Sequence, residues 1–396
     1  MSTVNERMEA LGNVRSVIRD LFEYGIRRKQ EIGEENVFDY SLGNPSVPAP
    51  ASVNEAFRDL IENADPVRLH GYTSAAGAED VRQAVADDLN RRFDAGVSAS
   101  DLYMTCGAAA SLTITLNALS TPEAECVAIA PFFPEYRVFA EGAGMKFRVV
   151  DADTERFQID FESLEKTVNE HTKALIVNSP NNPSGVVLKR STLERLCSFL
   201  CGREKEYGHP IYLISDEPYR ELVYDGKEVP FLTGLYDDTV VCYSYSKSLS
   251  LPGDRIGYIL VGPKAEGHEA LYAAVAGAGR SLGYVCAPTL LQRVIARCTG
   301  QTSDLGVYVE NRDLLYGALT KMGYEAVYPD GAFYLFVKAP GNDASAFSEK
   351  AKKHGLLLVP SDSFGCEGYV RIAYCVSTDM IRRSLPAFEE LMREYR

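Results

Sequence analysis

The chain lacks three features that mark common classes of protein. Positive charge is not in excess, because 41 lysines and arginines stand against 55 aspartates and glutamates, a net charge of −14. This argues against nucleic acid or an anionic membrane surface as a partner. The longest weakly apolar stretch, residues 270–291, contains Arg280 and several glycines, which makes it a poor membrane span. Residues 1–7 lack the apolar stretch of a secretory signal.

Cysteine and histidine also lack the arrangement of a metal site. The nine cysteines form no Cys-x-x-Cys pair, and the five histidines are scattered. Cys197 and Cys201 share the face of an expected helix, but no histidine lies nearby in the sequence to complete a site. We therefore expect reduced cysteines, a cytoplasmic location and no bound metal.

What is present is the composition of a large globular protein. It has 396 residues, 46% hydrophobic and 24% charged, which exceeds one typical domain and allows an ample core. Strand-like apolar runs alternate with helical patterns, at residues 102–105, 127–130, 147–150, 174–178, 211–215, 240–243 and 256–261. This alternation predicts an α/β fold with a mostly parallel sheet, whose ligands bind beyond the carboxyl ends of the strands.

A second domain is indicated where the pattern changes near residue 287. A long helical stretch runs to Lys321, and strand-like runs follow at residues 333–337, 356–360 and 369–374. These predict a smaller α+β domain, which also includes the residues before about Asn44. Residues 43–50 are the strongest linker-like stretch of the chain. We expect a large domain over residues 45–290 and a small domain over residues 1–44 and 291–396.

One lysine lies among hydroxyl groups just after a predicted strand. Ser244, Ser246 and Lys247 follow the run at 240–243, and Arg255 lies eight residues beyond Lys247. A lysine amine can form a Schiff base with an aldehyde, while serines and an arginine fork suit a phosphate. The alternative is an exposed loop lysine beside polar residues.

Polar residues follow two more predicted strands. Asp216 closes the run at 211–215, and Tyr219 lies three residues on. Asp216 could cap a turn, or it could be held against a protonated ring nitrogen. Asn182 lies in an Asn-, Pro- and Ser-rich segment that could be a simple turn. Because a proline follows it, Asn182 would be extended, which gives its amide a rigid mount.

Three further segments each allow two interpretations. Gly107, Ala108 and Ala109 lie between a strand and a helix, either as an ordinary helix start or as free amides that bind phosphate. Phe133, after the run at 127–130, could be core or could stack on a ring. Arg371, inside an alternating strand, could be solvated or could clamp a substrate carboxylate.

Taken in chain order, these segments resemble the fold-type I pyridoxal-phosphate (PLP) enzymes, specifically the class I/II aminotransferases. The resemblance runs from Gly43 to Arg371, and its core is N-P-S-G, D-E-P-Y and S-Y-S-K with an arginine eight residues later. It implies a large PLP-binding domain with a mostly parallel seven-stranded sheet, and a smaller α+β domain. It also implies ping-pong transfer of the α-amino group from an L-amino acid to a 2-oxo acid, through a Schiff base at Lys247.

The resemblance implies roles around the cofactor. Lys247 would also move the proton at the substrate Cα, and Asp216 would keep the ring nitrogen protonated. Asn182 and Tyr219 would hydrogen-bond the ring oxygen, and Phe133 would stack on the ring. The phosphate would be held by backbone and side-chain donors of Gly107, Ala108, Ala109, Ser244, Ser246 and Arg255.

The resemblance also implies how substrate and a second subunit bind. Gly43, Asn182 and Arg371 would bind the substrate α-carboxylate. Tyr72 would reach the cofactor phosphate of the neighbouring subunit, which implies a homodimer with shared active sites.

The chain departs from many relatives at Ala108 and Ala109, where they carry a hydroxyl or amide side chain, so the phosphate would rely more on backbone amides.

A PLP-dependent carbon–sulfur β-lyase on the same fold is the main alternative function. A protein without turnover is a third, against which Lys247, Asp216 and Arg371 argue. The sequence leaves open whether Arg280 meets a substrate side-chain carboxylate, and which N-terminal residues cover the site.

Overall fold

The computed structural model describes residues 3–13 and 16–396, and the chain divides into two compact units. Unit 1 is formed by Met1–Asn44, Gly306–Pro329 and Phe333–Arg396, and unit 2 by Pro45–Leu305 and Asp330–Ala332. Residues 291–305, which we expected in the small domain, lie in unit 2. The reason is that Val294, Ile295 and Cys298 join a core with residues of the first 100 of the chain, a non-local contact that helical periodicity cannot reveal.

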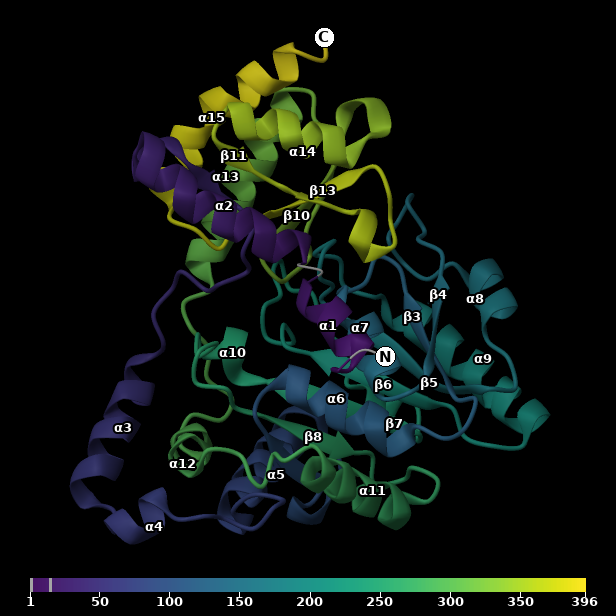
Figure 1. Cartoon of the computed structure of the whole chain (residues 1–396). Helices are drawn as coiled ribbons and strands as arrows, with labels where there is room; N and C mark the ends of the chain where they lie inside the picture. Colours follow the sequence, from purple (N-terminus) through teal and green to yellow (C-terminus); the bar gives the residue numbers. More distant parts are fainter. Residues whose placement is uncertain (1–2, 14–15) are drawn as a thin grey trace. The chain divides into compact units, whose positions relative to one another are not determined.

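Unit 2 is built on a seven-stranded sheet in the order β2-β8-β7-β6-β5-β3-β4 (Figure 1). Strand β8 runs antiparallel to both neighbours, and all other neighbours are parallel. The predicted α/β class and the mostly parallel seven-stranded sheet are therefore confirmed. The strands are β2 (Leu102–Thr105), β3 (Glu125–Ile129), β4 (Lys146–Val150), β5 (Thr172–Asn178), β6 (Tyr212–Glu217), β7 (Thr239–Ser244) and β8 (Gly257–Val261).

Both faces of this sheet are covered, because side chains alternate along each strand. On β7, Val240 and Cys242 enter a core shared with α6, α7 and α11, whereas Val241 and Tyr243 enter a core shared with α3, α5 and α12. Helices α8 and α9 cover this second face beside β3, β5 and β6. Their bounds are α3 (Ala51–Asn63), α5 (Glu79–Phe93), α6 (Ala108–Leu119), α7 (Glu135–Gly142), α8 (Phe161–Thr167), α9 (Arg190–Tyr207), α11 (His268–Ser281) and α12 (Thr289–Ala296).

The remaining elements of unit 2 are short. They are the helices α4 (Pro66–His70) and α10 (Tyr245–Ser248), and the 3-10 turns η2 (Ala99–Asp101) and η3 (Leu232–Gly234). The turn α10 carries the predicted lysine directly after the carboxyl end of β7.

Unit 1 is an α+β unit. Its antiparallel sheet has the order β12-β13-β10-β9, and a separate parallel pair joins β1 to β11. The strands are β1 (Phe38–Asp39), β9 (Ala326–Val327), β10 (Tyr334–Lys338), β11 (Leu356–Leu357), β12 (Val359–Pro360) and β13 (Tyr369–Ala373). The helices are α1 (Glu6–Asn13), α2 (Val17–Ile32), α13 (Gly306–Lys321), α14 (Ala344–Lys353) and α15 (Thr378–Arg393), with 3-10 turns η1 (Glu34–Asn36), η4 (Pro340–Asn342) and η5 (Asp362–Phe364). Across the described ranges, no helix combines the length and apolar character that crossing a membrane requires.

Candidate functional site

The carboxyl ends of β5, β6 and β7 bring three predicted segments side by side. Asp216 on β6 pairs with Asn178 on β5 and with Cys242 on β7. Asn182 lies four residues after Asn178, and Lys247 lies five residues after Cys242. Because these strands are parallel, the segments that follow them start from the same edge of the sheet, which is where ligands bind in such folds.

Asp216 is a buried carboxylate with one oxygen left unpartnered. Its side-chain Oδ2 accepts a hydrogen bond from the Tyr136 hydroxyl, whereas its buried Oδ1 has no hydrogen-bond partner. Burial raises the pKa of Asp216 to about 7; the Tyr136 hydrogen bond lowers this pKa and the charge of Glu217 raises it. Since an unsatisfied buried acceptor is costly, Oδ1 is the expected contact point for a donor on a ligand.

The Asn178 side chain hydrogen-bonds the backbone at Asp216 and at Asn182, a role that the sequence did not predict. Its side-chain Nδ2 donates to the Asp216 carbonyl oxygen at 2.9 Å, and its Oδ1 accepts from the Asn182 backbone N–H at 2.7 Å. Asn178 thus joins the end of β6 to the turn that carries Asn182. The only sequence signal was its position at the head of the Asn- and Pro-rich segment.

Tyr219 and Phe133 are placed by the turns that follow β6 and β3. Tyr219 is buried, and its carbonyl oxygen accepts a hydrogen bond from the Leu222 N–H at 2.8 Å. Phe133 is half-buried, and its ring meets that of Tyr136 edge-to-face, with centroids 5.8 Å apart and planes at 86°. Tyr136 therefore contacts both Phe133 and Asp216, a role that sequence analysis did not predict.

Lys247 lies on the four-residue helix α10, which Ser244 caps. The Ser244 Oγ accepts a hydrogen bond from the Ser246 N–H at 3.2 Å and lies 2.8 Å from the Ser246 Oγ. Both serines are buried and Lys247 is half-buried. This differs from the exposed loop lysine of the alternative interpretation.

Arg255 lies against the N-terminus of α6. Gly107 caps that helix with φ 90°, and a Cβ atom placed on it would lie 2.9 Å from Arg255 Nη2. Gly257 pairs with Thr105 on one side and with Ser244 on the other, so the serine segment borders the same corner. A helix N-terminus, a guanidinium and hydroxyl groups together suit an anion such as phosphate. Ala108 and Ala109 are the first residues of this helix.

Arg371 and Gly43 share a neighbour within unit 1. Arg371 on β13 is 2% exposed, and its Nη2 donates to the Ser41 carbonyl oxygen at 2.6 Å. Its guanidinium lies 4.7 Å from the centroid of the Tyr334 ring, and a Cβ on Gly43 would clash with the same Tyr334. Arg371 is thus a buried cation and not the solvated strand arginine of the alternative interpretation.

The two remaining predicted residues lie at the surface of unit 2. Tyr72 follows α4 and is 89% exposed, and Arg280 is exposed in the last turn of α11.

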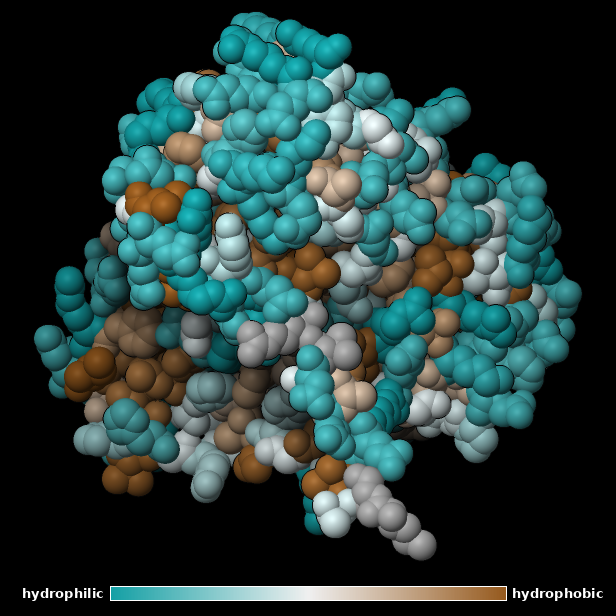
Figure 2. Space-filling view, turned by 45° about the horizontal axis from the view of Figure 1, so that its top comes forward, coloured by the Kyte–Doolittle hydropathy of each residue, from teal (hydrophilic) through white to brown (hydrophobic). Residues whose placement is uncertain are grey.

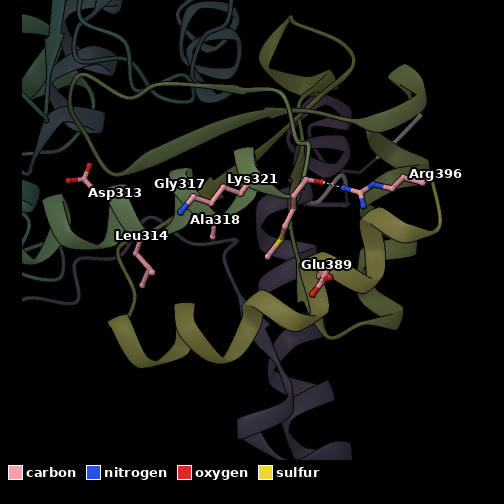
Figure 3. Close-up of a pocket in the computed structure, with 8 residues that line it drawn as sticks. Asp313, Leu314, Gly317, Ala318, Lys321, Glu389 and Arg396 are labelled. Atoms are coloured by element: carbon pink, nitrogen blue, oxygen red, sulfur yellow. Dashed lines mark hydrogen bonds between the residues drawn. The ribbon is translucent and has the colours of Figure 1, made fainter.

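A cavity of about 510 Å³ between α13 and α15 of unit 1 contains none of the predicted site residues (Figure 3). Its wall includes Leu314, Lys321, Glu389 and Arg396, and the Arg396 side chain donates to the Met322 carbonyl oxygen at 2.6 Å.

Comparison with known proteins gives consistent matches. Residues 35–388 match the family described as aminotransferase class I and II. The chain is 29% identical over 395 residues to a probable N-acetyl-LL-diaminopimelate aminotransferase of Bacillus subtilis, covering 96% of each chain. It is 28% identical over 363 residues to an aspartate aminotransferase of Thermotoga maritima, covering 90% of this chain and 92% of that one.

Solved structures match along the same length. An amino transferase from Eubacterium rectale is 55% identical, with a TM-score of 0.98 and 100% of both chains covered. The Thermus thermophilus aspartate aminotransferase with maleate is 25% identical, with a TM-score of 0.86, covering 99% of this chain and 100% of that one.

Proposed function

Because the chain belongs to the class I and II aminotransferases, which depend on pyridoxal phosphate, we propose that Lys247 is the residue that binds this cofactor. The resemblance inferred from the sequence, the aminotransferase activity and the cofactor are confirmed. What we propose is which residues bind the cofactor and perform the transfer. We assign unit 2 as the cofactor-binding domain and unit 1 as the small domain.

The residues of unit 2 fit the cofactor. Asp216 Oδ1 is a buried acceptor that lacks a donor, and a protonated pyridine nitrogen is such a donor. Arg255 beside the start of α6, with Ser244 and Ser246 bordering it, suits the phosphate. The unpartnered Asp216 Oδ1 beside the Lys247 segment is the single observation that carries the proposal.

Each residue then has a defined task. Bound pyridoxal phosphate withdraws electrons from the substrate Cα and so makes its proton acidic. Asp216, ionised and buried, holds the proton on the ring nitrogen, because a charge pair is stronger away from water. Lys247 Nζ takes the proton from Cα and returns it during the transfer. Asn182 and Tyr219 donate hydrogen bonds to the ring oxygen, and Phe133 packs on the ring.

The substrate carboxylate is assigned to Arg371, with Gly43 of the same unit as a further contact. A guanidinium fork can bind both carboxylate oxygens at once. The aromatic ring of Tyr334 at 4.7 Å limits the directions in which the Arg371 fork can point.

We also assign the exposed apolar surface around α3 and α4 to the interface of a homodimer. Ile61, Val67 and Tyr72 are 64%, 80% and 89% exposed, and Figure 2 shows hydrophobic side chains at its lower left, over this region. Exposed apolar groups of this kind mark interaction surfaces. In this assignment Tyr72 reaches the cofactor phosphate of the partner subunit. The nine cysteines, all free thiols, support the proposed cytoplasmic location.

The experiment that tests the function is a panel of twenty amino acids, each mixed with the cofactor-loaded protein. We expect some of them to change the absorbance of the bound cofactor and to yield the matching 2-oxo acid, with the amino group transferred to an added acceptor. The names of the relatives favour this over the β-lyase alternative. Pyruvate and ammonia released from cysteine-type substrates without an acceptor would contradict the proposal and favour the lyase.

A further inference from the structure

We propose that Tyr136 is a positioning residue for the cofactor ring, acting through Asp216 with its hydroxyl and through Phe133 with its ring. The inference rests on the proposed function, because it takes Asp216 Oδ1 as the contact of the ring nitrogen. It concerns a residue that neither the sequence motifs nor the comparisons single out.

Tyr136 is held rigidly in the core of unit 2. It lies in the first turn of α7, its N–H donates to the Phe133 carbonyl oxygen at 3.0 Å, and it is 1% exposed. Its ring belongs to the cluster that also contains Ala128, Ala130 and Ile214. The phenol is therefore held in one position, in which its hydroxyl donates a hydrogen bond to Asp216 Oδ2.

The hydrogen bond from Tyr136 decides which carboxylate oxygen is available. The terminal torsion of an aspartate is broad and roughly two-fold, so an unrestrained carboxylate can exchange or tilt its two oxygens. With Oδ2 engaged by the phenol, Oδ1 is the carboxylate oxygen left without a partner. Burial and the negative charge of Asp216 raise the pKa of Tyr136 far above its ordinary value, so the phenol keeps its proton and stays a donor.

The other titratable neighbours of Asp216 are engaged elsewhere. The two carboxylate oxygens of Glu217 accept hydrogen bonds from Ser215 Oγ at 2.6 Å and from Arg220. The Cys242 Sγ lies 3.6 Å from the Thr115 hydroxyl. No substitute for the Tyr136 hydroxyl is therefore provided by Glu217 or Cys242.

The ring of Tyr136 has a second, separable action. Its edge-to-face contact with Phe133, at 5.8 Å and 86°, fixes the orientation of the aromatic ring assigned to stack on the cofactor. Edge-to-face aromatic pairs are stabilising beyond the surface area that they bury. Tyr136→Phe removes only the hydroxyl action, whereas Tyr136→Leu removes both.

The test is a double-mutant cycle on the affinity of the apoprotein for pyridoxal 5′-phosphate. Wild type, Tyr136→Phe, Asp216→Asn and the double variant are titrated with the cofactor, and dissociation constants are read from absorbance and fluorescence. A hydrogen bond to a charged group is typically worth enough to weaken binding roughly 10- to 100-fold when it is lost. We expect a loss of about tenfold or more for Tyr136→Phe, but about twofold or less when the same change is made in the Asp216→Asn background.

Two controls accompany the cycle. Tyr212→Phe removes a hydroxyl that donates to the Glu266 carbonyl oxygen at 2.9 Å, and it should leave the dissociation constant unchanged. Tyr136→Leu should weaken binding further than Tyr136→Phe, because the Phe133 contact is lost as well. Circular dichroism of each apoprotein verifies that the variants fold.

The outcomes separate the inference from the function on which it rests. Wild-type affinity in Tyr136→Phe, with weakened binding in Asp216→Asn, would overturn the positioning role and leave the proposed function intact. Equal losses in both backgrounds would show that the Tyr136 hydroxyl acts independently of Asp216, which also overturns the positioning role. Unchanged affinity in Asp216→Asn would instead refute the assigned role of Asp216.

Discussion

At the scale of single residues, Asp216 shows how burial changes the chemistry of an ordinary side chain. An aspartate in water has a pKa near 3.8, and burial raises that of Asp216 to about 7. The carboxylate is thus suited to a positive partner, because ionisation of a buried carboxylate alone is costly and ionisation against a protonated ring nitrogen is not.

This residue predicts a pH dependence of the stability of the apoprotein. Between pH 3.8 and about 7, folded Asp216 holds a proton that the unfolded chain has released, so the free energy of unfolding falls as pH rises. Asp216→Asn abolishes this term. From pH 5 to pH 8 the variant should gain about 2 kcal/mol relative to wild type.

Urea denaturation of both apoproteins at the two pH values measures the change. If the unfolding free energies of wild type and Asp216→Asn differ by the same amount at pH 5 and pH 8, the raised pKa of Asp216 is contradicted.

At the scale of elements, the turn from β2 into α6 depends on a glycine that permits close approach. Gly107 has φ 90°, a conformation that L side chains rarely adopt. Any Cβ atom there would lie 2.9 Å from Arg255 Nη2. The geometry of one turn thereby places the guanidinium beside the helix N-terminus.

We expect Gly107→Ala to destabilise the protein by about 1–2 kcal/mol. It should also weaken pyridoxal-phosphate binding about tenfold, because Arg255 must move away from the start of α6, where the phosphate is proposed to bind. The matched control is Gly202→Ala in α9, where an added Cβ meets nothing within 4 Å. It should stabilise by up to about 1 kcal/mol and leave cofactor affinity unchanged. Thermal unfolding and cofactor titration measure both. Normal cofactor affinity in Gly107→Ala would show that the close approach of Arg255 to residue 107 is not needed for binding.

Sequence reasoning predicted the elements that local patterns define. The seven strands of the large sheet were predicted because apolar runs end at turn residues, and Lys247 was singled out because hydroxyls surround it after such a run. Tyr136 and Asn178 were missed because their hydrogen bonds link strands and helices 38 to 80 residues apart. No local pattern carries that information.

Residues 291–305 were assigned to the small domain for a related reason. Their periodicity continues toward α13, and only their packing with distant residues such as Val53 and Val85 places them in unit 2.

At the scale of the whole molecule, the surface that a single chain leaves exposed around Tyr72 supports the proposed homodimer. If Tyr72 contacts the partner's cofactor, Lys247→Ala damages the site of the chain that carries it. Tyr72→Ala instead damages the site of the partner chain. A hybrid dimer of the two variants then has one site with both wild-type residues and one with neither.

We therefore expect hybrid dimers, formed by co-expression with two affinity tags, to recover about half of the wild-type activity at limiting cofactor. Homodimers of Lys247→Ala should be inactive, because they lack the lysine that moves the Cα proton. Homodimers of Tyr72→Ala should show much less activity than wild type, because a lost phosphate contact weakens cofactor binding about tenfold. Analytical ultracentrifugation checks the oligomeric state. A hybrid no more active than the better parent would place Tyr72 outside the partner's site.

The most direct test of the central assignment is the site of covalent attachment of the cofactor. The loaded protein is reduced with borohydride, digested and analysed by peptide mass spectrometry. The account predicts one modified peptide, with reduced pyridoxal phosphate on Lys247, and no modification in Lys247→Ala. Attachment to another lysine, or an unmodified Lys247 in a fully active preparation, would contradict it.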